Sequence, residues 1–238
     1  MGRHQVRRLR RFLLLNLPLI SLIIFLSFQQ QTFQRQTAPQ PDMSRFIKVN
    51  EQGEFLSPWQ GPWHCVLDTQ TGMLWEAKSD DESIRDSYWT YSWFDGETGK
   101  PNLGDCYFEE NRCDTDDLIR RANQMTLCGQ SDWALPDHHQ LSSIIDLDTS
   151  IGKPRVDPGF FPKTKAGDYW TSDSAAPLSG VYRRHGYGAK AINFGSGDTT
   201  HLPYRNAAFV RLVSASFHTE HSPSFRLSQY STVVTDER

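Results

Sequence analysis

The distribution of apolar and polar residues along the chain predicts its elements. The segment FLLLNLPLISLIIFLSF, from Phe12 to Phe28, is apolar and carries no charge over seventeen positions. Its length is at the short end for a membrane-spanning helix and slightly beyond a usual signal-peptide core. Further on, apolar residues flank the sequence DTQTG in residues 65–76, and Asp, Thr and Gly are residue types that close tight turns. This second pattern predicts a β-hairpin.

Two segments have apolar residues at helical spacing. The first lies in 113–129, where Asp114 or Thr115 can cap the start, and Gly129 is suited to the left-handed residue after the helix. The second begins after Asp137, an N-cap with Gln140 as its capping-box partner. The predicted apolar faces consist of Leu118, Ile119, Ala122 and Met125 in the first helix and Leu141, Ile144 and Ile145 in the second.

The last third of the chain contains short β-prone runs separated by Gly-rich turns, DYWTSD, YGAKAINFGSGDTTHL and NAAFVRLV, which predict an antiparallel sheet. A hairpin followed by two helices and then by strands indicates an α+β fold. The segment RFIKVNEQGEFL, residues 45–56, is expected to add a peripheral strand. Residues 215–238 are rich in Ser and Thr and form a polar C-terminal tail.

The positions of the charged residues divide the N-terminal region into separate segments. Residues 1–11 hold five arginines and no acid, so we expect a cytoplasmic basic segment before an uncleaved signal anchor at 12–28, with the rest exported. Because no small-residue cleavage site follows the apolar run, we favour the anchor over the alternative, secretion after signal cleavage. Residues 29–61, rich in Gln, Pro and Ser, are read as a stalk, and 62–214 as the domain. The predicted location is a bacterial inner membrane, with the domain in the periplasm and residues 12–28 in the lipid bilayer.

The net charge of the exported part argues against nucleic-acid binding. Residues 1–41 carry six of the 25 basic residues and none of the 28 acidic ones, which leaves nineteen against 28, a net charge of −9. Within this part the charge is uneven, because residues 64–150 are strongly acidic whereas 151–211 hold nine basic and four acidic residues. A binding surface for an acidic partner is therefore expected in the second half.

Export places the four cysteines in an oxidising compartment, where an even number indicates two disulfides. Three pairings are open to four cysteines. The short separation of Cys106 and Cys113 allows them to close one loop, which would leave Cys65 to join Cys128 across the fold. No Cys-x-x-Cys spacing indicates a metal site, and we predict neither a metal nor a cofactor.

The candidate binding site is YRRHGYGAKAINFGSGDTTHLPYR, residues 182–205, where basic side chains alternate with tyrosines Tyr182, Tyr187 and Tyr204 on exposed hairpins. Arginine hydrogen-bonds carboxylates or sulfates, and tyrosine stacks on sugar rings. Adjacent histidines His138 and His139 do not suit a shared metal. No known hydrolase or nucleotide-binding motif is present, and no residue is predicted to be catalytic. The proposed binding residues are Arg183, Arg184, His185, Tyr187, Lys190, His201 and Arg205.

Seven phrases in order resemble the Lcl C-terminal domain family, a bacterial family named after the end domain of a collagen-like adhesin. They are CVLDTQTGMLWE at 65–76, RDSYWTYSW at 85–93, LCGQSDWALP at 127–136, QLSSIID at 140–146, FFP at 160–162, YWTSD at 169–173 and FVRLV at 209–213. The family usually has Arg where Ala134 stands and Glu where Gln140 stands.

The resemblance implies an exported domain that is distantly similar in fold to C-type lectin-like and formylglycine-generating-enzyme-like domains. We expect a non-enzymatic binding domain whose partner is a polysaccharide or an envelope protein. The expectation is compatible with a monomer and with an oligomer of this chain. The alternative is an enzyme on the formylglycine-generating-like scaffold, which needs a free cysteine thiolate. A third hypothesis is a calcium-stabilised loop in the acidic stretch GDCYFEENRCDTDD, residues 104–117.

Overall fold

The computed structural model describes residues 45–106 and 113–215, all within one compact unit, Ser44–Gln229. The expected anchor at 12–28, residues 29–44 of the expected stalk and residues 216–238 of the expected tail lie outside the described residues. In the part of the chain that is described, no helix is long and apolar enough to cross a bilayer.

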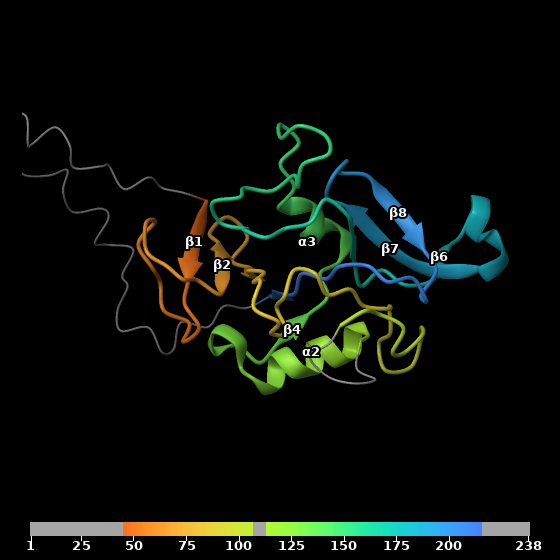
Figure 1. Ribbon diagram of the computed structural model, residues 1–238, viewed down its shortest axis with the longest axis horizontal. Coiled ribbons are helices and arrows are strands. Elements are labelled where there is room, and N and C mark those ends of the chain that lie inside the picture. The colour runs from red at the N-terminus through yellow and green to blue at the C-terminus, as the bar shows by residue number, and fades with distance from the viewer. Residues whose placement is uncertain (1–44, 107–112, 216–238) are drawn as a thin grey trace, which may run out of the picture. The chain divides into compact units, whose positions relative to one another are not determined.

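The first sheet has five antiparallel strands in the order β1-β2-β3-β9-β4 (Figure 1). The predicted hairpin is confirmed, because β2 pairs with β3 across the DTQTG turn. The predicted peripheral strand is also confirmed as β1, which pairs with β2 at the sheet edge. The strands are β1 Phe46–Val49, β2 Cys65–Asp68, β3 Leu74–Glu76, β4 Trp133–Ala134 and β9 Val213–Ser214.

The second sheet is built around β7, which pairs with β5 and β6 along one edge and with β8 along the other. A 3-10 turn, η2 (Gly180–His185), connects β6 to β7. The predicted strand at 206–213 is largely wrong, since only Val213 joins a strand and Ala208 and Phe209 form isolated bridges. The strands are β5 Asp168–Trp170, β6 Ala176–Pro177, β7 Tyr187–Asn193 and β8 Thr199–Leu202.

Both predicted helices are present. Helix α2 (Thr115–Gln124) begins after Asp114, whose carboxylate accepts the Asp117 backbone N–H at 2.9 Å. After α2 the backbone is left-handed at Thr126, at Cys128 and, as predicted, at Gly129, whose φ is +73°. Gly129 does not end the helix directly, because a 3-10 turn, η1 (Leu127–Gly129), follows α2.

Helix α3 (His138–Ser143) has the predicted capping box. The Asp137 carboxylate accepts the Gln140 N–H at 2.7 Å, and the Gln140 side chain accepts the Asp137 N–H at 2.8 Å. Leu141 and Ile144 are buried, as their spacing predicts.

Tryptophan side chains connect the two sheets to the loops between them. Trp75, Trp93, Trp133 and Trp170 are buried, whereas Trp63 is half-buried. The indole N–H of Trp93 donates to the Thr171 carbonyl at 2.8 Å, and that of Trp170 donates to the Tyr91 carbonyl at 2.7 Å. These paired bonds join residues 91–93 to the strand β5 region, so the indoles supply polar contacts as well as apolar area.

Two disulfides fix the first half of the domain. Cys65 in β2 is bonded to Cys128 in η1, with 6.4 Å between their Cα atoms, and Cys106 is bonded to Cys113, with 5.6 Å. This is the pairing that the short Cys106–Cys113 separation suggested. No cysteine in the chain is left free, since all four lie in the described residues.

Candidate functional site

Three residues of the predicted basic surface lie in η2. Arg183, Arg184 and His185 are consecutive and exposed, and their side chains form no hydrogen bond or ion pair with any described residue. Two apolar side chains flank them, Val181 at 87% exposure and Tyr187 at 63%. Three unpaired cationic or ionisable groups beside exposed apolar surface can contact an acidic ligand and its apolar parts together.

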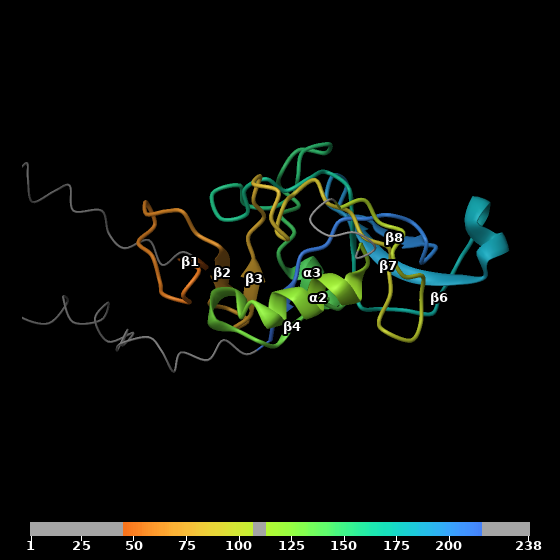
Figure 2. The same ribbon diagram turned by 60° about the horizontal axis from the view of Figure 1, so that its bottom comes forward.

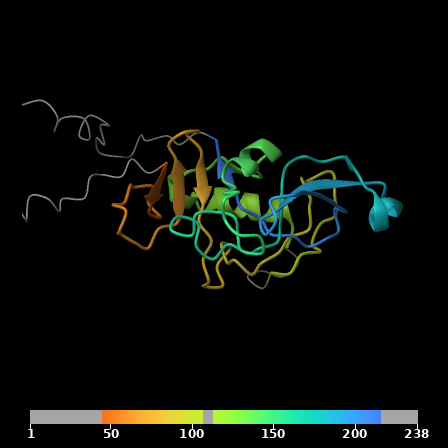
Figure 3. The same cartoon turned by 90° about the horizontal axis from the view of Figure 1, so that it is seen from above.

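The η2 turn projects beyond β6 at the end of the domain opposite β1, as the views in Figures 1, 2 and 3 agree. Gly180 at φ +55° and Gly186 at φ +73° bracket the turn, and a built Cβ at either would meet no atom within 4 Å. Left-handed backbone rather than crowding therefore accounts for glycine at both ends.

Lys190 and His201 are directly opposite each other on β7 and β8, but both have intramolecular partners. The Lys190 ammonium lies 3.2 Å from Asp173 Oδ1, and His201 Nδ1 lies 3.1 Å from the Pro177 carbonyl oxygen. Burial alone would raise the pKa of Asp173, but hydrogen bonds from the His138 N–H and from Lys190 lower it below its ordinary value. These two residues are less available to a ligand than the η2 group.

The tyrosines of the predicted surface have different roles. Tyr204 packs on Trp93 with ring centroids 5.0 Å apart, and its hydroxyl accepts the Ala175 N–H at 2.9 Å. The Tyr182 hydroxyl accepts from Asn206 at 3.3 Å, and this ring is partly buried against the core. Of the three, Tyr187 alone is exposed, so the expectation that all three are displayed is wrong. Arg205, in the turn after β8, is exposed and unpaired within the described residues.

The two adjacent histidines contact their surroundings separately. His138 Nε2 lies 2.7 Å from Thr199 Oγ1, while His139 is exposed. No group of three or more potential metal ligands occurs in the described ranges. The hypothetical calcium loop at 104–117 falls partly on residues 107–112, outside those ranges; Asp114 in it is occupied as the α2 cap.

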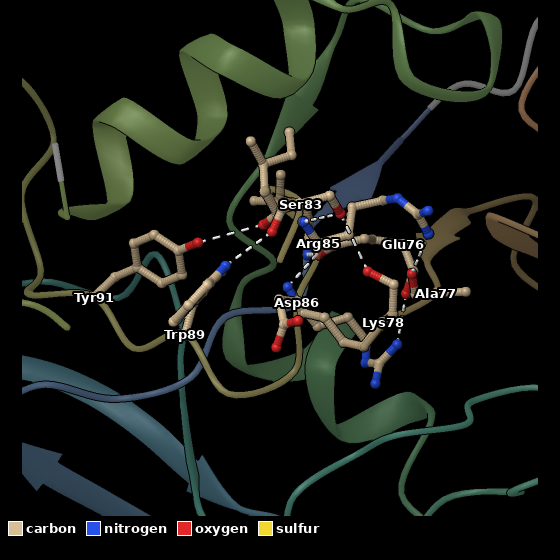
Figure 4. Close-up of polar contacts among 12 residues, drawn as sticks. Glu76, Ala77, Lys78, Ser83, Arg85, Asp86, Trp89 and Tyr91 are labelled. Atoms are coloured by element: carbon tan, nitrogen blue, oxygen red, sulfur yellow. Dashed lines mark hydrogen bonds and ion pairs between the residues drawn. The ribbon is translucent and has the colours of Figure 1, made fainter. Parts of the chain in front are cut away.

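A buried cluster of charged side chains lies away from this surface (Figure 4). Lys78 donates to Glu76 Oε1 at 2.7 Å, and the other carboxylate oxygen accepts the Leu212 N–H at 3.0 Å. Arg211, fully buried, donates to the Glu76 carbonyl at 2.5 Å and to Thr164 Oγ1 at 2.8 Å. Burial lowers the pKa of Lys78, and Glu76 opposes the shift.

The neighbouring loop 79–88 is closed by Asp86. Its carboxylate accepts three backbone N–H groups, from Asp81 at 3.0 Å, Glu82 at 2.8 Å and Tyr88 at 2.9 Å. Figure 4 shows Trp89 and Tyr91 pointing at the same turn, where they donate to the carbonyls of Ser83 at 2.8 Å and Ile84 at 3.3 Å. The loop is thus held by side chains from both of its sides.

Sequence reasoning did not single out this cluster or the loop beside it, although several of their charged residues, but not Lys78, lie in the phrases that carry the family resemblance. Glu76 ends the first phrase, Arg85 and Asp86 begin the second, and Arg211 is the centre of the last. Because these groups bond one another and the backbone, we attribute the phrases to folding and not to chemistry on a substrate. The sequence also did not indicate a surface hollow, which is lined by residues between Thr149 and Thr164.

The enzyme hypothesis required a free thiolate, and the structure contradicts it. Both disulfides consume all four cysteines, and a disulfide sulfur is not a nucleophilic thiolate.

Comparison with known protein families gives a match to the domain. A family model described as the Lcl C-terminal domain matches residues 64–214, more than half of the chain. No curated protein matches the chain, and no solved structure matches it. The matched range coincides with the described sheets and helices from β2 to β9, and on this evidence the chain belongs to the Lcl C-terminal domain family.

Proposed function

We propose that this protein is a non-enzymatic binding domain that holds an acidic ligand at its η2 end. The group of Arg183, Arg184 and His185 carries the proposal, because three exposed cationic or ionisable side chains in succession lack any partner among the described residues. A charged group without an intramolecular partner loses no internal bond when it binds a ligand.

The position of η2 supports the same role. The described chain enters at Arg45 beside β1, whereas η2 lies at the opposite end (Figures 1 and 2). If residues 12–28 anchor the protein in the inner membrane, as their composition predicts, the chain from the anchor joins the domain at Arg45 and not at η2. An exported location and a lectin-like fold are part of this proposal.

The ligand class that fits is a polyanion with some apolar surface. Arginine forms paired hydrogen bonds to carboxylate or sulfate groups, and exposed Tyr187 offers a ring face to a sugar or an apolar side chain. An acidic glycan and an acidic segment of an envelope protein both have this chemistry.

The test compares retention of the full-length protein on immobilised dextran sulfate, neutral dextran and polyglutamate at about 50 mM and about 500 mM salt. Attraction between exposed charges is screened at the higher salt, so retention on the acidic matrices should fall. We expect Arg183→Ala/Arg184→Ala to lose retention at low salt. The matched control is Lys100→Ala/Arg120→Ala, which removes the same charge from elsewhere on the surface.

Preference for dextran sulfate over polyglutamate would indicate a glycan, and the reverse an acidic protein. Equal loss of retention in both double variants would show that net charge alone is responsible, and would reject η2 as the site.

A further inference from the structure

We propose that the hollow formed by residues 149–164 is a second binding site, which takes a small carboxylate with an apolar body. It has a volume of about 270 Å³ and is independent of the η2 surface. Its lining residues are Thr149, Lys153, Pro154, Val156, Pro158, Phe161, Pro162, Lys163 and Thr164.

The floor of the hollow is apolar and its rim is charged. Val156 and Phe161 are almost fully buried at 2% and 1% exposure, and three proline rings complete the apolar lining. The two lysines of the lining, Lys153 and Lys163, are exposed. A ligand would therefore place its apolar part inward and its polar part at the rim, the arrangement typical of small-molecule sites.

The charge at the rim selects an anion. Both charged lining residues are cationic, and Lys163 is paired with Asp80 at 3.1 Å. The Lys153 ammonium has no partner among the described residues and is the group available for a carboxylate. The two lining hydroxyls are already engaged, because Thr149 donates to Asp146 at 2.8 Å and Thr164 donates to the Phe161 carbonyl at 2.8 Å.

The floor is held in position from behind. The Phe161 ring meets the Phe46 ring edge-on with centroids 5.1 Å apart, and the Arg211 guanidinium lies 5.0 Å from its centroid. Arg211 is itself fixed by bonds to Glu76 and Thr164. The buried charged cluster thus supports one wall of the hollow.

The loop that carries Thr149 and Lys153 is also attached to the sheet region. The Gly152 N–H donates to the Gly195 carbonyl at 2.9 Å, and the Arg155 N–H donates to the Phe194 carbonyl at 2.8 Å. A site whose walls are fixed before binding loses little conformational entropy when a ligand enters.

The size of the hollow limits the ligand. Sites for drug-sized molecules occupy roughly 300–1,000 Å³, so this one suits a compound of about ten non-hydrogen atoms. Phenylacetate has the required chemistry, and so does the C-terminal residue of a peptide that ends in phenylalanine. A ligand of this size should bind with a dissociation constant on the order of 1 mM.

Saturation-transfer NMR on the full-length protein in lipid nanodiscs measures such weak binding. We expect phenylacetate to bind about fivefold more tightly than phenylacetamide, its neutral counterpart, because the carboxylate meets Lys153. Lys153→Met should remove this difference, whereas Lys100→Met, an exposed lysine that does not line the hollow, should keep it. Thr149→Phe, which fills the hollow from its loop, should weaken both compounds.

Gly-Gly-Phe with a free or an amidated C-terminus identifies the source of the carboxylate. Binding of the free tripeptide would indicate a peptide end, and binding of phenylacetate alone a free acid; both support the site. Equal affinity for the acid and the amide, or an unchanged preference in Lys153→Met, would overturn it. Retention on dextran sulfate should be unaffected by Thr149→Phe, so the two proposals fail separately.

Discussion

The Glu76 carboxylate accepts a hydrogen bond of 2.7 Å from the Lys78 ammonium, and both side chains are buried. Arg211, also buried, donates to the Glu76 backbone carbonyl, so a second cation lies near this carboxylate without bonding to it. Removing one partner of a buried ion pair leaves the other charge unpaired and buried, which strongly destabilises the fold. The cost is smaller when another group nearby can still interact with the remaining charge.

Glu76→Gln should therefore destabilise the protein by about 3–5 kcal/mol. Lys78→Met should cost less, because the Glu76 carboxylate keeps its hydrogen bond from the Leu212 N–H and still has the positive charge of Arg211 nearby. Urea denaturation followed by tryptophan fluorescence measures both. If Lys78→Met proved the more damaging change, Glu76 would not be the centre of the cluster.

The two disulfides should differ in their effect on stability. A cross-link restricts the unfolded chain more when it closes a longer loop, and the separations are 63 residues for Cys65–Cys128 and 7 for Cys106–Cys113. The loop-entropy relation gives a loss of about 4 kcal/mol for Cys65→Ser/Cys128→Ser and about 2 kcal/mol for Cys106→Ser/Cys113→Ser. Thermal unfolding of the two double variants under non-reducing conditions checks the order, which equal losses would contradict.

Helix caps give a third prediction. Asp137→Ala should cost about 1 kcal/mol, typical of an N-cap. Asp114→Ala should cost about 2 kcal/mol because this buried carboxylate also accepts the Asn102 N–H at 3.1 Å. Asp148→Ala, whose side chain is exposed, is the matched control and should be neutral within about 0.5 kcal/mol. An Asp114→Ala variant no less stable than Asp137→Ala would show that the bond to the Asn102 N–H contributes nothing.

Acid should weaken the fold through Asp68. Burial alone would raise the pKa of Asp68, but hydrogen bonds from Arg45 and the Gln70 N–H lower it below its ordinary value of 3.8. The folded-state pKa of Asp68 lies below its pKa in the unfolded chain. Asp68 therefore contributes its full stabilisation at any pH above the unfolded-state pKa. The contribution is lost as the pH falls through the folded-state pKa.

Denaturation midpoints between pH 7 and pH 2 test this prediction. Asp68→Asn should be less stable at pH 7 and should show a smaller decline in acid than the unchanged protein. An identical decline in both would assign the acid sensitivity to other carboxylates, such as Asp173, whose pKa is also lowered.

Local features of this protein could be predicted from the sequence. The Asp137–Gln140 capping box, the Asp114 cap and the DTQTG hairpin depend on residues within a few positions of one another, so turn chemistry and apolar spacing are sufficient to indicate them. The position of left-handed Thr126 was missed because the helix ended earlier than the glycine signal suggested.

The sequence by itself determined the α+β class, both caps, the first hairpin and the even cysteine count that indicates disulfides. Only the tertiary structure decided which tyrosines of 182–205 are exposed, that Lys190 is paired with Asp173, and that Glu76 meets Arg211 from 135 positions away. The physical reason is that spacing along the chain reports neighbours on one helix or strand. Burial and ion pairing depend on which distant segments pack together.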